Sequence, residues 1–471
     1  MRCIAYRDEK GDGVVLALPS WMTRHWRLRR IADAMDPQER LLQRIHSKEA
    51  TVGVVGLGYV GLPFAVEKAK VGYRVLGIDR NSLRVEQVNR GENYISDVKS
   101  AELENLVRRG RITAHTGVDC ISEMDVIVIC VPTPLTKNLT PNLQYVMGVA
   151  NEIAPRLRAG QFVSLESTTY PGTTEEVLLP ILESSGLKVE ADFFLAHSPE
   201  RVDPGNKRYT TKNTTKIVGA VGPISLNVAV AFYSQTIEQV VPLSSAKAAE
   251  LAKIFENTFR SVNIALVNEL MLLCDRMGLS VWEVLEAAFT KPFGIMPFWP
   301  GPGVGGHCIP LDPHYLEWKA KELNFRTHFI ALAGEINRRM PEFVREKAWR
   351  VLNQLGVAPS RAKVLVLGAA YKRDLDDARE SPAIEVIRLL RQGGAEVRYH
   401  DPFVRTVASA EFEMQSVPLT RELLEEQDLV VVATDHSSID YDWVVRCSVH
   451  VLDTRNATQG VGRHRERITL L

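Results

Sequence analysis

Two stretches of the chain alternate between short apolar, β-forming runs and helical segments. In the first stretch, the strand-forming runs occupy residues 51–55, 74–78, 125–131, 162–166 and 193–196. In the second stretch, they occupy residues 364–368, 395–400, 429–433 and 449–452. Helical segments at 64–70 and 382–392 lie between the first two runs of each stretch. Strands that alternate with helices predict a parallel sheet covered by helices, so each stretch predicts one α/β domain.

The residues between these stretches follow a helical period instead. Apolar positions recur at three and four residues and predict one buried stripe of Leu251, Ile254, Phe255, Thr258, Val262, Ala265 and Leu266. Lys253 and Asn257 are one turn apart and roughly opposite this stripe, so we expect them to be neighbours. A second helix is predicted over 281–289, and a long helical stretch over about 316–355 has a possible break at Met340-Pro341.

The composition limits the classes of function. Lys plus Arg and Asp plus Glu both number 57, so the net charge of zero predicts no general attraction to nucleic acid or to a membrane. The six cysteines are far apart and form no metal-site spacing, which predicts free thiols, no metal, and a reducing compartment. No run of 18 uncharged apolar residues is present. We therefore expect a cytoplasmic protein.

A glycine-rich turn follows the first predicted strand. Gly56, Gly58 and Gly61 form a GxGxxG motif before a helix, and a second strand ends at Asp79, 18 residues beyond Gly61. In a dinucleotide-binding fold the glycines allow a tight turn, close approach of the pyrophosphate and helix packing, while the acid accepts from ribose hydroxyls. Asp79 would repel a 2′-phosphate and therefore favours NAD over NADP. Neighbouring Arg80 is a counter-signal, because an arginine there could bind the 2′-phosphate of NADP. Glycine turns of this kind also serve packing alone.

The fold class predicted is therefore α/β, with two Rossmann-like doubly wound domains joined by a helical central domain with a long connecting helix. We place an N-terminal extension at 1–48, an NAD-binding domain at 49–240, the central domain at 241–358 and the last domain at 359–471. The segment 24–44 fits either an amphipathic helix packed on a neighbour or a loosely attached extension, and we favour the extension. We assign the extension no function.

A second glycine-rich loop carries candidate chemistry. Residues 301–306 contain four glycines and precede Cys308 and Asp312, an arrangement typical of a nucleophile held beside a carboxylate. The alternative is a surface turn with an unreactive thiol. Thr133, Thr168 and Glu200 follow the carboxyl ends of predicted parallel strands, where ligand-contacting loops gather, although capping and turn formation explain each one equally well.

Five motifs in order resemble the UDP-glucose/GDP-mannose dehydrogenase family. They are residues 56–61, 198–200, 250–257, 305–312 and 371–382, and the similarity runs from about Thr51 to the C-terminus. The resemblance implies oxidation of the C6 alcohol of a nucleotide sugar to a carboxylate with two NAD. The versions SPERVDPGN at 198–206 and PFWPGPGVGGHCIPLDPHYL at 297–316 look most like members that oxidise UDP-N-acetylglucosamine. His307, where glucose-specific members commonly have a small polar residue, argues against UDP-glucose.

The resemblance also implies roles for individual residues. Cys308 would form a thiohemiacetal and then a thioester, Lys253 with Asn257 would stabilise the oxyanion, Asp312 and Thr168 would organise protons and water, and Glu200 would assist hydrolysis. The implied cofactor-binding residues are Gly56, Gly58, Tyr59, Val60, Gly61, Asp79, Arg80, Arg84, Thr133, Thr168 and Arg379. The implied substrate-binding residues are Glu200, Arg201, Val202, Lys253, Asn257, Gly303, Gly305, Lys372 and Arg455.

Several alternatives stay open at this stage. The sugar could be UDP-GlcNAc, which we favour, or UDP-GalNAc, UDP-ManNAc or UDP-glucose. A two-electron hydroxy-acid dehydrogenase would share the NAD domain without needing the thiol, and a non-catalytic nucleotide-sugar binder would lack part of the set Cys308, Lys253 and Asp312, which is complete here. The resemblance and the long central helix also predict a homodimer.

Overall fold

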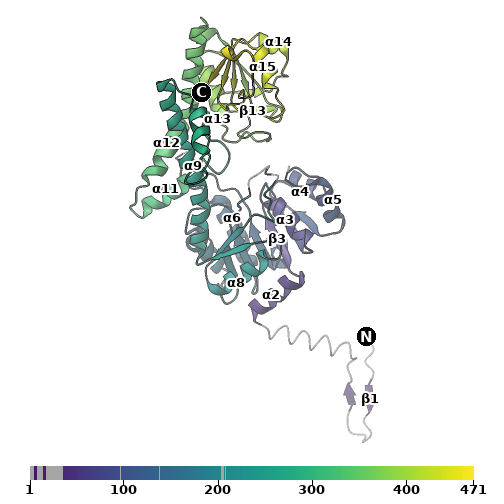
Figure 1. Cartoon of the computed structure of the whole chain (residues 1–471). Helices are drawn as coiled ribbons and strands as arrows, with labels where there is room; N and C mark the ends of the chain where they lie inside the picture. The colour runs from purple at the N-terminus through teal and green to yellow at the C-terminus, as the bar shows by residue number, and fades with distance from the viewer. Residues whose placement is uncertain are drawn as a thin grey trace. The chain divides into compact units, whose positions relative to one another are not determined.

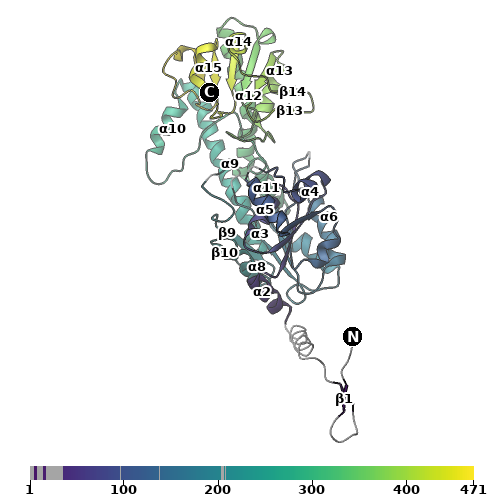
Figure 2. The same cartoon turned by 90° about the vertical axis from the view of Figure 1, so that its right-hand side faces the viewer.

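The computed structural model describes residues 36–95, 97–136, 138–202, 206 and 208–471, together with a pair of short antiparallel strands, β1 (Ala5–Arg7) and β2 (Val14–Leu16). Most of the predicted extension, and residues 203–205 of the SPERVDPGN motif, lie outside the described residues. The chain forms two compact units (Figures 1 and 2). Unit 1 contains the described residues up to Pro132 with 144–167 and 172–250, and unit 2 contains 133–143, 168–171 and 251–471.

Unit 1 is built on an eight-stranded sheet with the order β10-β9-β8-β7-β6-β3-β4-β5. Its strands are β3 (Thr51–Val55), β4 (Arg74–Ile78), β5 (Ile112–His115), β6 (Val126–Ile129), β7 (Phe162–Leu165), β8 (Phe194–His197), β9 (Lys216–Ala220) and β10 (Val240–Leu243). All neighbours are parallel except β8 and β9. Strands β4 and β5, which follow β3 in the chain, lie on one side of it, and β6 and the strands that follow it lie on the other, so the strand order reverses between β3 and β6. Ligand-binding loops are therefore expected at the carboxyl ends of these two strands.

Helices cover both faces of this sheet. They are α2 (Pro37–Ser47), α3 (Gly61–Lys70), α4 (Ser82–Asn89), α5 (Ser100–Arg108), α6 (Gln144–Ile153), α7 (Leu179–Glu183) and α8 (Pro223–Tyr233). Side chains alternate along each strand: Val126 and Val128 enter the core beneath α3 and α8, whereas Ile127 and Ile129 enter the core beneath α6 and α7. The strands are therefore buried on both faces, which explains why they read as continuous apolar runs.

Helix α2 falls inside the segment that we assigned to the N-terminal extension. Its Leu41 and Ile45 are buried in the core beneath α8, Tyr73 donates from its hydroxyl to the Ile45 carbonyl at 2.7 Å, and Arg44 pairs with buried Asp125 at 2.8 Å. The favoured prediction of a loosely attached extension is therefore wrong for the described part of 24–44, which belongs to a helix packed on its neighbour.

Unit 2 combines a helical region with a five-stranded parallel sheet of order β12-β11-β15-β16-β17. Its strands are β11 (Lys363–Leu367), β12 (Glu396–His400), β15 (Leu429–Val432), β16 (Val451–Asp453) and β17 (Ile468–Leu470), with a hairpin of β13 (Thr406–Ala408) and β14 (Glu413–Gln415). Its helices are α9 (Ala246–Met277), whose first residues belong to unit 1, α10 (Val281–Phe289), α11 (Asp312–Glu322), α12 (His328–Gln354), α13 (Pro382–Gln392), α14 (Arg421–Glu425) and α15 (Tyr441–Cys447).

One core joins the helical region to this sheet. Met271 of α9, Val344 of α12 and Val386 of α13 pack with Val366 of β11, while α14 and α15 cover the opposite face. Figure 1 shows α9 and α12 as the two long helices of this unit. The α/β class with a Rossmann sheet, a long central helix and a second parallel sheet is confirmed.

Two details of the helical region differ from our predictions. Helix α12 continues through Met340 and Pro341, which are buried, and the interruption lies instead at 323–327, where Asn324 has a φ of +54°. The loss of one backbone hydrogen bond at a buried proline is evidently offset by packing.

The predicted buried stripe of α9 is also wrong in part. Ile254, Thr258 and Ala265 are buried, but Leu251, Phe255 and Leu266 are exposed by 43%, 61% and 62%. Lys253 and Asn257, which we placed opposite the stripe, are buried. The buried face of this helix includes polar residues, among them Asn257 and Asn268, which bond to Asp312 and Asn337 of other helices. Apolar periodicity alone therefore predicted the wrong face.

Candidate functional site

The three glycines of the motif in unit 1 have different surroundings. Gly56 has a φ of +96°, and a Cβ there would lie 2.3 Å from the Cys130 carbonyl oxygen, so a side chain does not fit. A Cβ at Gly61 would lie 1.8 Å from the Gly56 carbonyl oxygen, because α3 begins directly against the turn. A Cβ at Gly58 would meet nothing within 4 Å. The first and third glycines are therefore needed for packing, and the second faces the open space that a pyrophosphate would require.

Asp79 lies at the end of β4 beside this turn. Its Oδ2 accepts from the Leu57 amide at 2.9 Å and its Oδ1 accepts from the Asn81 amide at 2.9 Å. The Arg84 guanidinium lies 3.6 Å from Oδ2, whereas Arg80 extends to Glu152 at 3.5 Å. The acid still exposes 11% of its side chain. With Tyr59 and Val60 at the start of α3, these residues fit a dinucleotide whose ribose meets Asp79 and whose phosphates meet the helix start.

Glu200 follows β8 in the same unit and lies next to a buried charge network. Its Oε1 accepts from the amides of Arg201 and Val202, both at 2.8 Å, and its Oε2 lies 3.4 Å from Lys216 Nζ. Lys216 also donates to buried Glu166 at 2.8 Å. Burial alone would lower the pKa of Lys216, but the two carboxylates raise it overall, so Lys216 is a fixed cation beside Glu200. Nothing in the sequence pattern of β9 singled out Lys216.

In unit 2, four of the predicted catalytic residues gather around the start of α11. Asp312 is the first residue of that helix, and its amide donates to the Cys308 carbonyl at 2.8 Å. Asn257 of α9 donates from its side-chain amide to Asp312 Oδ2 at 2.6 Å. Lys253, one turn earlier on α9, is buried and acts electrostatically on both Asp312 and Cys308. The thiol, the carboxylate, the amide and the ammonium group therefore share one environment.

The electrostatics of this cluster suit proton transfer near neutral pH. Burial raises the pKa of Asp312 to about 6, against the opposing effects of the Lys253 charge and the Asn257 hydrogen bond. Desolvation and the nearby Asp312 charge raise the pKa of the Cys308 thiol, while Lys253, Arg379 and Arg260 act to lower it. Cys308 is exposed as a residue, although its thiol is desolvated by the surrounding protein. A base that titrates near pH 6 is well placed to take protons from an alcohol or a thiol.

The glycine-rich loop before Cys308 is fixed at both ends by polar groups. The Gly301 amide donates to Asn268 Oδ1 at 3.0 Å, and Asn268 donates in turn to Asn337 of α12 at 2.9 Å. Near the other end, the Gly306 amide donates to the Arg379 carbonyl at 3.2 Å. Gly306 has a φ of +90°, and a Cβ there would lie 2.8 Å from the Tyr371 ring. The loop therefore packs directly on the charged loop 369–382.

That charged loop and the loop after β16 carry the predicted substrate cations. Lys372 lies on the first, and Arg455 donates to the Ala433 carbonyl at 3.0 Å beside Gly301, where a Cβ would lie 2.7 Å from its guanidinium. Gly303 and Gly305 pack against Pro382.

Arg379 is paired within its own loop, donating to both Asp377 oxygens at 2.6–3.0 Å. Its predicted contact with the dinucleotide therefore competes with an existing ion pair.

Thr133 and Thr168 are brought together in unit 2. The Thr133 hydroxyl donates to the Thr168 carbonyl at 2.7 Å, and the hydroxyl of Tyr315 on α11 donates to the Thr133 carbonyl. Tyr315 is three residues beyond Asp312, so both threonines are tied to the helix that carries the candidate base. Sequence reasoning missed Tyr315, Asn268 and Asn337, because a buried tyrosine or asparagine has no motif of its own.

The remaining predicted residues of the turn and of the 198–206 segment, from Gly56 to Arg84 and from Glu200 to Val202, lie in unit 1. Within the described ranges, no group of three or more His, Cys, Asp or Glu side chains could hold a metal ion. A search of the same ranges finds no helix with the length and apolarity needed to cross a membrane.

Comparison with protein families finds three consecutive matches. Residues 50–237 match the NAD binding domain of the UDP-glucose/GDP-mannose dehydrogenase family, 247–339 match its central domain and 365–460 match its UDP binding domain. The last match contains loop 369–382 and Arg455, and the first contains the glycine motif and Asp79.

Comparison with individual proteins also finds UDP-sugar dehydrogenases. The chain is 36% identical over 411 residues to the UDP-N-acetyl-D-mannosamine dehydrogenase of Pyrococcus horikoshii, covering 86% of this chain and 95% of that one. It is 34% identical over 392 residues to the UDP-N-acetyl-D-glucosamine 6-dehydrogenase of Pseudomonas aeruginosa, covering 83% and 91%. The solved structure of the UDP-D-ManNAc dehydrogenase of Pyrococcus horikoshii superposes with a TM-score of 0.79 at 34% identity, covering 86% and 96%. The chain belongs to the UDP-glucose/GDP-mannose dehydrogenase family and is an NAD-dependent UDP-sugar dehydrogenase.

Proposed function

We propose that the protein oxidises the C6 alcohol of a UDP-2-acetamido sugar to the uronic acid, a four-electron reaction that passes through a covalent bond to Cys308. The observation that carries the proposal is the cluster in which Cys308, Asp312, Asn257 and Lys253 share one environment at the start of α11. A dehydrogenase that stops at the aldehyde needs no thiol, so the accessible Cys308 beside a base argues for the second oxidation.

NAD supplies the hydride acceptor for each of the two oxidations. In the first, Asp312 takes the proton of the C6 hydroxyl as the carbon loses its hydride, and Lys253 with Asn257 stabilises the negative charge on the oxygen. The Cys308 thiol then adds to the aldehyde carbon, forming a C–S bond, and its proton passes to the oxygen. Loss of the second hydride and of that proton leaves a thioester. Water cleaves the C–S bond, giving the uronic acid and restoring the Cys308 thiol with a proton from the water.

Other residues take supporting roles in the proposal. Glu200, which is held beside the Lys216 cation, assists attack by water on the thioester, and Thr168 helps to position that water. Lys372 and Arg455 bind the UDP phosphates, and Gly303 and Gly305 let the loop backbone approach the sugar. Asp79 and Arg84 bind the adenosine ribose of NAD.

The identity of the sugar is the finest part of the proposal. Motif versions in the sequence favour UDP-GlcNAc, whereas relatives carry the names of enzymes for both UDP-ManNAc and UDP-GlcNAc. These two sugars differ only in configuration at C2, so the acetamido group is the shared feature. The proposal also keeps the cytoplasm as the compartment, on the pattern of isolated thiols in the sequence.

The test is to measure NADH released per uronic acid formed from UDP-GlcNAc, UDP-ManNAc, UDP-GalNAc and UDP-glucose. We expect two NADH per acid, with UDP-GlcNAc or UDP-ManNAc preferred. The Cys308→Ala variant should form no uronic acid, whereas Cys274→Ala, at a buried thiol elsewhere on α9, should keep the wild-type ratio. Full acid formation by Cys308→Ala would refute the covalent route, and preference for UDP-glucose would refute the acetamido assignment.

We further propose a homodimer formed through α9. Its exposed apolar residues Phe259, Leu266 and Leu273 are seven residues apart, and Leu251, Phe255 and Met277 extend the same face. A seven-residue apolar repeat is the pattern by which one helix packs along another. A second copy of the same helix, related by a twofold axis, would cover it.

A further inference from the structure

The sheets of the two units place an aspartate at the same position of their folds. In unit 1, Asp79 follows β4 and accepts from the amide of Leu57, which is two residues past the end of β3. In unit 2, Asp401 follows β12 and its Oδ2 accepts from the amides of Ala369 and Ala370 just past β11, at 2.6 and 2.9 Å. The position that would bind a ribose in a dinucleotide fold therefore contacts a backbone turn in both units.

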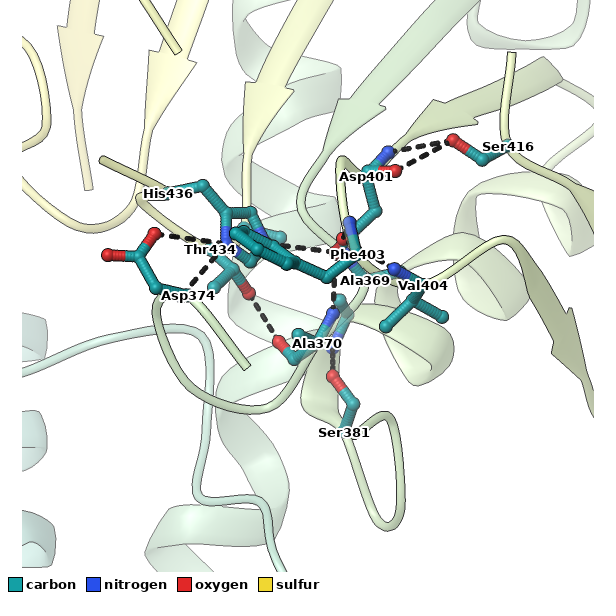
Figure 3. A network of polar contacts seen from close by, with 12 residues as sticks. Ala369, Ala370, Asp374, Ser381, Asp401, Phe403, Val404, Ser416, Thr434 and His436 are labelled. Atoms are coloured by element: carbon teal, nitrogen blue, oxygen red, sulfur yellow. Dashed lines mark hydrogen bonds and ion pairs between the residues drawn. The ribbon is translucent and has the colours of Figure 1, made fainter. Parts of the chain in front are cut away.

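Asp401 differs from Asp79 in having a buried histidine as a further partner. His436, from the loop after β15, lies 2.9 Å from Asp401 Oδ2 through its Nε2, and neither side chain has any exposed surface. The other oxygen, Oδ1, accepts from the amides of Phe403 and Val404 at 2.8 and 2.9 Å. Figure 3 shows these donors converging on the carboxylate from three loops. With five donors, Asp401 has no acceptor site left for a ligand.

The other ring nitrogen of His436 fixes the charged loop. The Asp374 amide, which can only donate, points to His436 Nδ1 at 3.0 Å, so Nδ1 accepts and Nε2 carries the hydrogen that Asp401 receives. Asp374 has a φ of +58°, an unfavourable conformation for a residue with a side chain, and this hydrogen bond helps to hold it. The Thr434 hydroxyl adds a bond to the Ala370 carbonyl at 2.5 Å.

The charged loop in turn supports the loop of the candidate nucleophile. Tyr371 packs against Gly306, two residues before Cys308, and the Arg379 carbonyl accepts from the Gly306 amide. A displacement of loop 369–382 would therefore move both Lys372 and the segment that leads to Cys308. Misplacement of reacting groups by about 1 Å costs on the order of a hundredfold in rate.

We propose that Asp401 and His436 are positioning residues that hold loop 369–382 in place. In this position the loop binds the uridine diphosphate and also fixes the position of the glycine-rich loop before Cys308. The inference rests on the proposed function only in naming Lys372 and Cys308 as the groups that are positioned. The juxtaposition of an acid with no free acceptor, a buried histidine and a strained loop residue carries it. Neither residue touches substrate in this role.

The test uses His436→Gln in the full chain, because the glutamine Nε2 can still donate to Asp401, whereas its acceptor oxygen is not held at the ring Nδ1 position that meets the Asp374 amide. Binding of UDP is measured by calorimetry, and the alkylation rate of Cys308 by iodoacetamide is measured by peptide mass spectrometry. We expect UDP affinity to fall about tenfold, as for loss of one hydrogen bond that orders a charged site, and the alkylation rate to change by at least a few-fold. NAD affinity, which reports on unit 1, should be unchanged. His436→Leu, which leaves Asp401 short of a donor, should show a larger effect.

The matched control is His450→Gln. His450 is a half-buried histidine directly before β16, and its Nε2 lies 2.9 Å from the hydroxyl of Thr469 in β17, which is outside loop 369–382. It should change thermal stability without changing UDP affinity or Cys308 alkylation. If His436→Gln lowers only the melting temperature, the positioning role is refuted and the pair is merely structural. A wild type that binds UDP but oxidises no UDP-sugar would instead refute the proposed function, because neither readout needs turnover.

Discussion

The side-chain amide of Asn257 donates to Asp312 Oδ2 over 2.6 Å and joins the middle of α9 to the first turn of α11. A hydrogen bond to the charged form of a carboxylate lowers its pKa, and here it opposes the burial that raises the pKa of Asp312 to about 6. We therefore expect kcat/KM to fall as the pH decreases below about 6. Asn257→Ala should shift this limb to higher pH, in addition to lowering kcat through loss of an oxyanion donor. The measurement is a pH–rate profile of kcat/KM.

Asn263→Ala is the control for that profile, because Asn263 lies on the same helix and its amide donates only to the Phe259 carbonyl. Its acid limb should coincide with that of the wild type. An unshifted limb in Asn257→Ala would show that Asp312 is not the group that titrates.

Asp312 also makes stability depend on pH. Its folded pKa of about 6 lies above the ordinary value of 3.8, so the folded chain binds a proton more tightly than the unfolded chain does. The group therefore favours folding at low pH, and this contribution is lost as the pH rises through about 6. The difference is on the order of 3 kcal/mol between pH 4 and pH 7.5. Asp312→Asn should gain stability relative to wild type at pH 7.5 but not at pH 4, in urea denaturation. Equal differences at both pH values would contradict it.

The contrast between Asp79 and Arg80 predicts cofactor selectivity. Asp79 holds the turn where we propose that the ribose binds, whereas Arg80 extends to Glu152. We expect Asp79→Asn to raise KM for NAD about tenfold and to reduce discrimination against NADP, because the repulsion of a 2′-phosphate is removed. Arg80→Ala should leave both parameters near wild-type values. A larger effect of Arg80→Ala on NADP than of Asp79→Asn would reverse the assignment.

The apolar face of α9 predicts a change of oligomeric state. Leu266→Glu introduces a charge into the middle of the proposed helix contact and should convert dimers to monomers in sedimentation velocity. Val449→Glu is the control, since Val449 is exposed by 49% but lies outside α9. If both variants and the wild type sediment alike, α9 does not form the contact between copies.

Glu250 predicts a large stability effect in unit 1. Its carboxylate is buried and accepts from the Gly172 amide at 2.5 Å and from the amide and hydroxyl of Thr174 at 2.8 and 2.7 Å. Glu250→Ala leaves three donors without partners and should destabilise the protein by about 2–4 kcal/mol in urea denaturation. Glu238→Ala, at an exposed residue 4.0 Å from Lys212, should change stability by less than about 0.5 kcal/mol.

The parts of the fold that local sequence determines were predicted closely. Strands at 51–55 and 74–78 and helices at 281–289 and 382–392 match the observed bounds, because apolar runs, caps and glycine turns lie together in the sequence there. Strand β9, which runs antiparallel to β8, and the edge strand β17 were not predicted. The extended structure of each depends on pairing with neighbouring strands, which the local sequence does not show.

The candidate site was predictable where a residue type carries chemistry, as with Cys308, Asp312 and Asp79. It was not predictable where a common residue acts through a distant partner. Asn268 is 33 residues from Gly301 and 69 from Asn337, and Tyr315 is 182 from Thr133. The wrong prediction of the buried face of α9 has the same origin, because buried Asn257 bonds to Asp312, which is 55 residues away in the sequence.

The saturation of Asp401 has a consequence for the order of events in turnover. Of the two equivalent acids in the part of the chain that the structure describes, Asp79 keeps a partly open side chain and Asp401 does not, so our assignment gives a ribose acceptor to only one of the two sheets. Under the proposed reaction, two NAD molecules must then bind at the same site one after the other. The first NADH has to dissociate while the sugar, oxidised only to the aldehyde, stays bound. The bond to Cys308 would thus be a tether as well as a chemical activator, because it keeps a reactive aldehyde from leaving during the exchange.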